Sequence, residues 1–266
     1  VMIVFGCFAL LFASVIFCGV IYLTIKREHG VVKAMGYLYL YLFSFFSIIG
    51  CLSVFLIFGQ ANDITCQLRI WVLALASAIT IGTMSAKQYR VLRIFGNTSL
   101  RPVVVATAQL IPIIAAICVP DLVVLTLWTA AFTYKADVDG NHLTCSSIFD
   151  LGFLIIMFAY KGILLSGLSV MAFYTRHYPS KFSESTQLAI AIYNTFLIGI
   201  ILVPVILAIS EEWLQFIFAG IFILSVFFVP WVIICVPKIY MIFSGAVDKT
   251  STFISPTHTP SKGTHT

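Results

Sequence analysis

Charged residues are scarce in this chain of 266 residues, because only 9% of them are Asp, Glu, Lys or Arg. Soluble domains carry about a quarter charged residues. Hydrophobic residues make up 61% of the chain. A soluble fold of this length still exposes roughly a quarter of the surface of its unfolded chain, and this sequence lacks the polar residues to cover it. The composition therefore excludes a water-soluble domain and indicates that lipid is the surrounding solvent.

Several other features are missing, and each absence excludes a class of function. No basic run with interleaved aromatic residues occurs, although the net charge is +5, which speaks against nucleic-acid binding. No Ser/His/Asp set converges and no pair of histidines has the helical spacing of metal ligands, so we expect neither an enzyme nor a cofactor. The five histidines lie in connections or at the C-terminus: His29, His142, His177, His258 and His265.

Long hydrophobic runs are what the sequence does contain. A helix needs about 20 apolar residues to cross the hydrocarbon core of a bilayer. The runs do not alternate polar and apolar residues, so they predict helices rather than strands of a barrel. We therefore predict an all-α membrane protein, a bundle of seven transmembrane helices. The predicted spans are 1–25, 34–58, 66–90, 102–132, 149–174, 185–209 and 213–239.

The distribution of basic residues predicts the orientation of the bundle, because cytoplasmic loops collect Lys and Arg. Eleven basic residues lie after spans one, three, five and seven, whereas the opposite connections carry most of the acidic residues and only two bases, Arg69 and Lys135. We therefore expect an extracellular N-terminus and a cytoplasmic C-terminus. The eleven are Lys26, Arg27, Lys33, Arg90, Arg93, Arg101, Arg176, Lys181, Lys238, Lys249 and Lys262.

The chain ends suggest how the sequence divides. The first run, 1–25, lacks a basic region before it and a small-residue cleavage site, so it is interpreted as a span and not a signal peptide. Because the sequence opens directly on that span, we expect it to be an excerpt of a longer protein. Residues 1–243 are predicted to form the transmembrane domain. Residues 244–266, rich in Ser and Thr, are predicted to form a disordered cytoplasmic tail.

Two of the seven cysteines lie in polar surroundings on the predicted outer side. Cys66 opens the third span and Cys145 belongs to the long connection between spans four and five. Thiols oxidise outside the cell, so we predict a disulfide between these two residues that fastens the outer loop to the third span. The other five cysteines lie inside apolar runs, where a thiol acts as a small hydrophobic group.

Ionisable residues inside spans are costly and are therefore candidate functional sites. Lys87 near the inner end of span three and Glu184 at the inner start of span six lie at similar depth. A salt bridge between them is one interpretation. The other is that Lys87 extends to the lipid headgroups while Glu184 interacts with the positive end of its helix.

Three further charges lie deeper or nearer the outer side. Asp121 in span four and Lys161 in span five are predicted to face the interior, where they pair directly, pair through water, or bind a ligand group or polar side chain. Arg69, at the outer end of span three, has either Asp63 or Asp121 as a candidate partner. Sequence spacing alone does not choose among these arrangements.

Several short motifs follow one another along spans three to seven. They are Ser85-Ala86-Lys87-Gln88-Tyr89-Arg90-Val91, Asp121 with Trp128, Tyr160-Lys161-Gly162, Thr175-Arg176, Glu184-Ser185 before Ile192-Tyr193-Asn194, and Val236-Pro237-Lys238. In this order the set resembles the transmembrane domain of class C G-protein-coupled receptors of the GABA type B group. One departure is Glu184, because the type B members typically carry Asp at that position.

The resemblance implies roles for several residues and partners. Lys87 and Glu184 would form an ionic lock that favours the inactive state, and Cys66–Cys145 fits the outer-loop disulfide of the group. Such receptors work as homodimers or heterodimers with another class C receptor, and a membrane lipid or sterol is a further candidate inside the bundle. The large extracellular ligand domain of the group is absent from this sequence.

The leading hypothesis is therefore a plasma-membrane receptor that transmits an extracellular signal to a heterotrimeric G protein. Basic residues at the inner ends are the candidate contacts of the G protein: Lys26, Arg27, Arg90, Arg93, Arg176 and Lys238. The alternative is a transporter or channel whose polar pathway contains Arg69, Asp121 and Lys161. A retinal-type photoreceptor is disfavoured, because it needs a lysine in the middle of span seven and Lys238 lies at the inner end.

Overall fold

The computed structural model describes residues 2–30, 32, 36–58, 63–95, 111–131, 135–139, 142–146, 150–175, 184–209 and 211–244. Within these residues seven helical segments are long and apolar enough to cross a membrane, which confirms the predicted seven-helix bundle. The helices are α1 (Met2–Ile25), α3 (Tyr37–Leu52), α4 (Val54–Phe58), α5 (Asp63–Phe95), α6 (Ile111–Ala131), α7 (Asp150–Thr175), α8 (Glu184–Ala208) and α9 (Glu212–Phe243).

The bounds of some spans differ from the sequence prediction. The third and seventh continue to Arg93 and Phe243, a few residues past their predicted ends. Hydropathy falls where Lys87, Arg90 and Lys238 occur, but these residues are good helix formers, so the helices do not stop there. The predicted start of the fourth span, residues 102–110, and most of the predicted tail, residues 245–266, lie outside the described residues.

The second span is interrupted once, at Ser53, where α3 ends and the short helix α4 begins. The hydroxyl of Ser53 donates a hydrogen bond to the carbonyl of Gly50 at 2.6 Å, and its amide donates to the carbonyl of Ile49 at 2.9 Å. A serine that bonds the preceding turn in this way loosens the regular helical ladder. Across the interruption the amide of Leu56 donates to the carbonyl of Ser53 at 3.0 Å.

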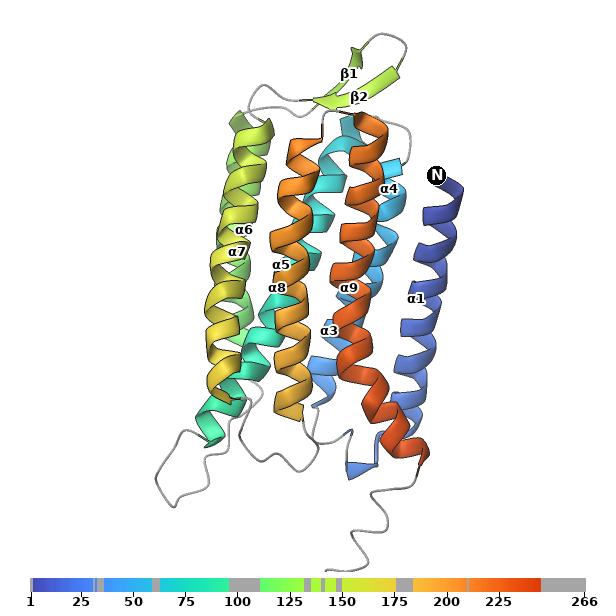
Figure 1. The fold of residues 1–266 in the computed structure, drawn as a ribbon, viewed down its shortest axis with the longest axis vertical. Helices are drawn as coiled ribbons and strands as arrows, with labels where there is room; N and C mark the ends of the chain where they lie inside the picture. The colour runs from blue at the N-terminus through green and yellow to red at the C-terminus, as the bar shows by residue number, and fades with distance from the viewer. Residues whose placement is uncertain are drawn as a thin grey trace, which may run out of the picture.

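The helices pack as a closed bundle (Figure 1). Helix α3 contacts α1, α5 and α9, while α8 lies between α7 and α9, and α6 packs on α5 and α7. The inner end of the bundle is defined here as the end where α1, α5, α7 and α9 finish and α3, α6 and α8 begin. The opposite, outer end carries the start of α1 and a small β-hairpin (Figure 1).

The hairpin lies in the connection between α6 and α7, where the sequence predicts a loop. Strands β1 (Lys135–Asp139) and β2 (His142–Ser146) are antiparallel, and Cys145 is paired with Ala136. Short paired strands satisfy backbone groups that a free loop would leave to water. The hairpin adds a fixed element to the outer end, close to the start of α5.

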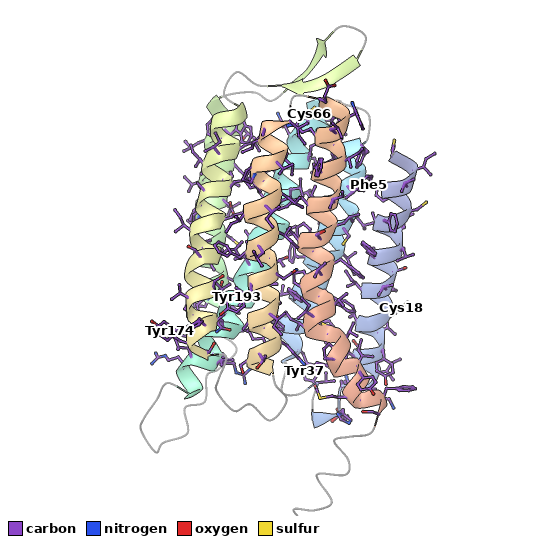
Figure 2. All side chains as sticks on the ribbon, viewed as in Figure 1. Phe5, Cys18, Tyr37, Cys66, Tyr174 and Tyr193 are labelled. Atoms are coloured by element: carbon purple, nitrogen blue, oxygen red, sulfur yellow. The ribbon has the colours of Figure 1, made fainter. Side chains whose placement is uncertain are left out.

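Large buried side chains fill the space between α1, α3 and α9, as the sticks of Figure 2 show along these helices. The indole of Trp231 donates a buried hydrogen bond to the hydroxyl of Ser44 at 2.9 Å, and the rings of Phe12 and Phe228 stack at 3.9 Å between centroids. A Cβ added at Gly50 would overlap the ring of Phe227. Glycine is therefore what lets α3 and α9 approach so closely.

Candidate functional site

Lys87 is the central residue of the inner end. It lies on α5 and is 5% exposed, and its Nζ atom stands 4.1 Å from the centre of the Tyr39 ring on α3. A cation held over an aromatic face is stabilised by the negative charge of the ring's π-system, most strongly where water is excluded. This contact keeps the ammonium group of Lys87 inside the bundle rather than extended toward lipid headgroups. The sequence interpretation that Lys87 extends outward is therefore wrong for this structure.

A second lysine is buried in the bundle. Lys238 on α9 is only 1% exposed. The prediction that Lys238 faces a G protein is therefore corrected. The reason is that α9 continues to Phe243, so Lys238 falls inside the helix on the face that packs against the bundle.

Two neutral polar residues join α5 to α7 at the same depth. The side-chain amide of Gln88 donates a hydrogen bond to the hydroxyl of Thr175, and both residues are fully buried. Thr175 is the last residue of α7. Sequence reasoning quoted both residues within motifs but assigned them no role, because uncharged side chains give no sign of their partner. The inner ends of α3, α5 and α7 are thus connected through these contacts.

Glu184 begins α8 at this same end of the bundle. Its side chain lies outside the described residues, so the pairing of Lys87 with Glu184 stays a prediction.

In the middle of the bundle Lys161 and Asp121 form an ion pair. The Nζ atom of Lys161 on α7 lies 2.8 Å from an Asp121 carboxylate oxygen on α6, and it also donates to the carbonyl of Ala74 on α5 at 3.3 Å. Asp121 is fully buried. The neighbouring Tyr160 donates to the carbonyl of Ile117 at 2.9 Å. Of the arrangements left open by the sequence, the structure therefore has direct pairing, and the pair links three helices.

Arg69 lies apart from this pair, at the outer end of α5. Its guanidinium group donates hydrogen bonds to the carbonyls of Leu56 at 3.2 Å and Ile57 at 3.1 Å, both in α4. These are carbonyl groups at the end of a helix, where no further helical partner follows. The side chain of Asp63, one of the predicted partners, lies outside the described residues. Arg69 thus fastens the outer end of the second span to the third.

Cys66 is also at the outer end and takes part in a disulfide. Its predicted partner, Cys145, lies in β2, and the side chain of that residue lies outside the described part of the chain, so the pairing stays a prediction. The five cysteines predicted to be hydrophobic packing residues are all free thiols: Cys7, Cys18, Cys51, Cys118 and Cys235.

The remaining basic residues of the inner end are more accessible. Lys26 and Arg27 are exposed after α1, and Arg27 is 3.7 Å from Glu28. Arg93 is exposed and donates to the hydroxyl of Tyr89 at 2.8 Å, whereas Arg90 is half-buried. Arg176 lies outside the described residues. The surface that these residues offer is basic, as cytoplasmic surfaces of membrane proteins are.

The fold and these buried contacts define a class of protein, a seven-helix membrane receptor domain. The family described as "7 transmembrane sweet-taste receptor of 3 GCPR" matches residues 1–238. The chain belongs to this family, the seven-transmembrane domain of class C G-protein-coupled receptors. It is a multi-pass protein of the plasma membrane.

Individual relatives agree with that assignment. The chain is 29% identical over 204 residues to metabotropic glutamate receptor-like protein O of Dictyostelium discoideum, a match that covers 70% of this chain and 24% of the relative. It is 25% identical over 153 residues to the human gamma-aminobutyric acid type B receptor subunit 2, covering 51% of this chain and 16% of the relative. The chain therefore matches about a quarter or less of the length of these proteins.

Proposed function

We propose that this chain is the signal-transducing membrane domain of a GABA type B-like receptor, and that it activates a heterotrimeric G protein. Its inner loops would receive the G protein, with Lys26, Arg27, Arg90 and Arg93 among the contacts. A change of packing imposed from outside would shift the bundle between inactive and active arrangements. The role is that of a receptor and not of an enzyme.

The observation that supports this proposal most is the buried charge at the inner end. Lys87 is held over Tyr39 at 4.1 Å, and α8 begins at the same end with Glu184. A salt bridge from Lys87 to Glu184 would connect α8 to the group of helices that Lys87 already joins. Because burying a charge is costly, such a contact favours the arrangement in which its partner is present. Separation of the two residues would release α8, which suits a two-state receptor.

We further propose that the receptor works as a homodimer or as a heterodimer with another class C receptor. The support is the similarity to a protein named as subunit 2 of a receptor. A membrane lipid or sterol inside the bundle remains part of the proposal. The alternative of a transporter is not favoured: Arg69 is engaged with carbonyls of α4, while Lys161 and Asp121 bind each other, so these three residues do not point into one shared pathway.

The lock is tested by removing either charge. We expect Lys87→Ala and Glu184→Ala each to raise basal nucleotide exchange on a co-expressed G protein about fivefold or more. The double variant should resemble the stronger single variant, because a pair can be broken only once. The exchanged pair, Lys87→Glu with Glu184→Lys, should restore low basal exchange.

Glu211→Ala is the matched control, because Glu211 is an exposed glutamate at the start of α9, at the opposite end of the bundle. Its basal exchange should equal that of the unchanged receptor. Additive effects of the two single variants, or normal basal exchange in both, would contradict the lock. Absence of any G-protein response in every receptor, including an agonist-stimulated dimer, would contradict the coupling itself.

A further inference from the structure

A pocket opens at the inner end between the start of α3, the end of α5 and the start of α6. It is a shallow groove with an enclosed volume of about 30 Å³. Lys87 forms part of its wall together with Tyr39 and Thr83, and Arg90 lies one turn further along α5. The rim is formed by Leu38 and Ile111, which are 39% and 52% exposed. The pocket therefore opens sideways to the surroundings of the bundle and not only into its interior.

The pocket is positively charged. Two of its lining residues, Lys87 and Arg90, are basic, and none of the described residues that line it is acidic. Gly36 adjoins it with a positive φ of 80°, a conformation that glycine adopts readily, and a Cβ at this position would lie 3.9 Å from the guanidinium of Arg90. An ammonium group and a guanidinium group on one wall form the arrangement that recognises phosphate.

The rest of the lining is apolar and lies at the level where the bundle leaves the hydrocarbon core. Leu38, Leu42, Ile111 and Ile114 belong to the pocket, and they come from the two helices on either side of Arg90. A free anion gains nothing from such walls, whereas a lipid has acyl chains to place along them. The positive-inside pattern of the loops puts this end at the cytoplasmic leaflet, where anionic lipids are concentrated.

We propose that this pocket binds an anionic phospholipid of the inner leaflet, with the head-group phosphate on Arg90, where the nearby charge of Lys87 also attracts it, and the chains against α3 and α6. Two adjacent cations select a phosphate monoester over a diester, because the monoester carries more negative charge. Phosphatidic acid is the simplest phospholipid whose head group is a phosphate monoester, so we assign this lipid class to the pocket. The inference depends on the orientation and the pocket and does not require G-protein coupling.

The test uses the whole chain in nanodiscs of phosphatidylcholine that contain a small fraction of phosphatidic acid. Retained lipid is counted by native mass spectrometry after release from the disc, without any G protein. We expect the unchanged receptor to retain phosphatidic acid, and Arg90→Gln to weaken that retention about tenfold, as for the loss of one charge-assisted hydrogen bond. Arg90→Lys should lie between the two.

Arg93→Gln is the matched control, because Arg93 lies on the same helix, carries the same charge and is exposed outside the pocket. It should retain phosphatidic acid as the unchanged receptor does. Equal losses in the Arg90 and Arg93 variants would overturn the proposal in favour of general surface attraction. Equal retention of phosphatidylserine, a diester, would overturn the head-group assignment.

Two further arms separate the sources of phosphate and guard against misfolding. Inorganic phosphate, added in excess to discs of phosphatidylcholine with phosphatidic acid, should displace no lipid; displacement would mean that the pocket binds the free anion. If Arg90→Gln does not fold, Leu38→Trp, which keeps both charges and narrows the mouth, must lower retention, and unchanged retention in that variant would overturn the proposal.

Discussion

Three cations of the bundle have three different kinds of partner. Lys161 has a carboxylate, Lys87 an aromatic face, and Arg69 the carbonyls at a helix end. Each partner compensates a positive charge, because a charge inside a membrane protein is costly unless nearby groups stabilise it. Among these three, the pair of Lys161 and Asp121 is special, because removal of one charged side chain leaves the other one without a counter-charge.

Asp121→Asn should therefore destabilise the bundle by about 3 kcal/mol, since it leaves the Lys161 ammonium buried without its carboxylate. Asp121→Asn combined with Lys161→Met should lose less than the single variant, because no charge remains to be compensated. The free energy of unfolding in detergent, measured by titration with a denaturing surfactant, provides the comparison. Thr126→Val, an exposed change on the same helix, is the control. A double variant less stable than Asp121→Asn would contradict the importance of the pair.

Which residues carry buried charge could be predicted from the sequence, but the partners of most could not. Lys87, Asp121 and Lys161 interrupt apolar runs and are conspicuous for that reason. Tyr39 was missed as the partner of Lys87, because an aromatic residue in an apolar run is not distinguishable from packing. Lys238 was misplaced, because hydropathy shows where a span loses apolar residues and not which way the side chain faces.

At the scale of the elements, close approach of helices depends on single small residues. Gly50 of α3 meets Phe227 of α9 with no room for a Cβ, and Gly19 of α1 meets Trp231 in the same way. Between helices in lipid, packing contacts replace the hydrophobic effect as the source of association. The sequence showed where these helices lie but gave no indication of these contacts, because glycine occurs in all types of helix position.

Gly50→Ala should destabilise the bundle by about 1–3 kcal/mol, since the added methyl group forces Phe227 and α9 away from α3. Gly167→Ala on α7 has no atom within 4 Å of the added Cβ, so it should be neutral or slightly stabilising. Surfactant-induced unfolding of the purified chain distinguishes the two. Phe227→Leu in the Gly50→Ala background should recover part of the loss. Equal free energies of unfolding in the Gly50→Ala and Gly167→Ala variants would show that the contact with Phe227 does not limit the approach of α3 and α9.

For the whole molecule, the number of spans and the family were accessible from the sequence, because length and hydropathy fix how often a chain crosses lipid. Residues 135–146 illustrate what was not accessible, since the β1–β2 hairpin has no clear alternation of polar and apolar residues and was predicted as loop. The orientation of the termini rests on the distribution of Lys and Arg alone. It is therefore a property to be measured directly.

An epitope tag inserted between Arg176 and Lys181 should be detected only after intact cells are permeabilised, because this loop is predicted to be cytoplasmic. A tag inserted between Asp139 and His142, at the turn of the hairpin, should be detected on intact cells. Antibody labelling with and without detergent measures both. Labelling of the first tag on unpermeabilised cells would reverse the orientation and, with it, the assignment of the inner end.

The two hydrogen bonds of Arg69 have a mechanical consequence. They tie the last turn of the second span to the helix that also carries Cys66, one turn nearer the outer surface. We therefore expect force applied to the disulfide to be shared between two helices at once. A tilt of the outer end of α5 draws α4 along with it, while the interruption at Ser53 lets the longer part of that span stay in place.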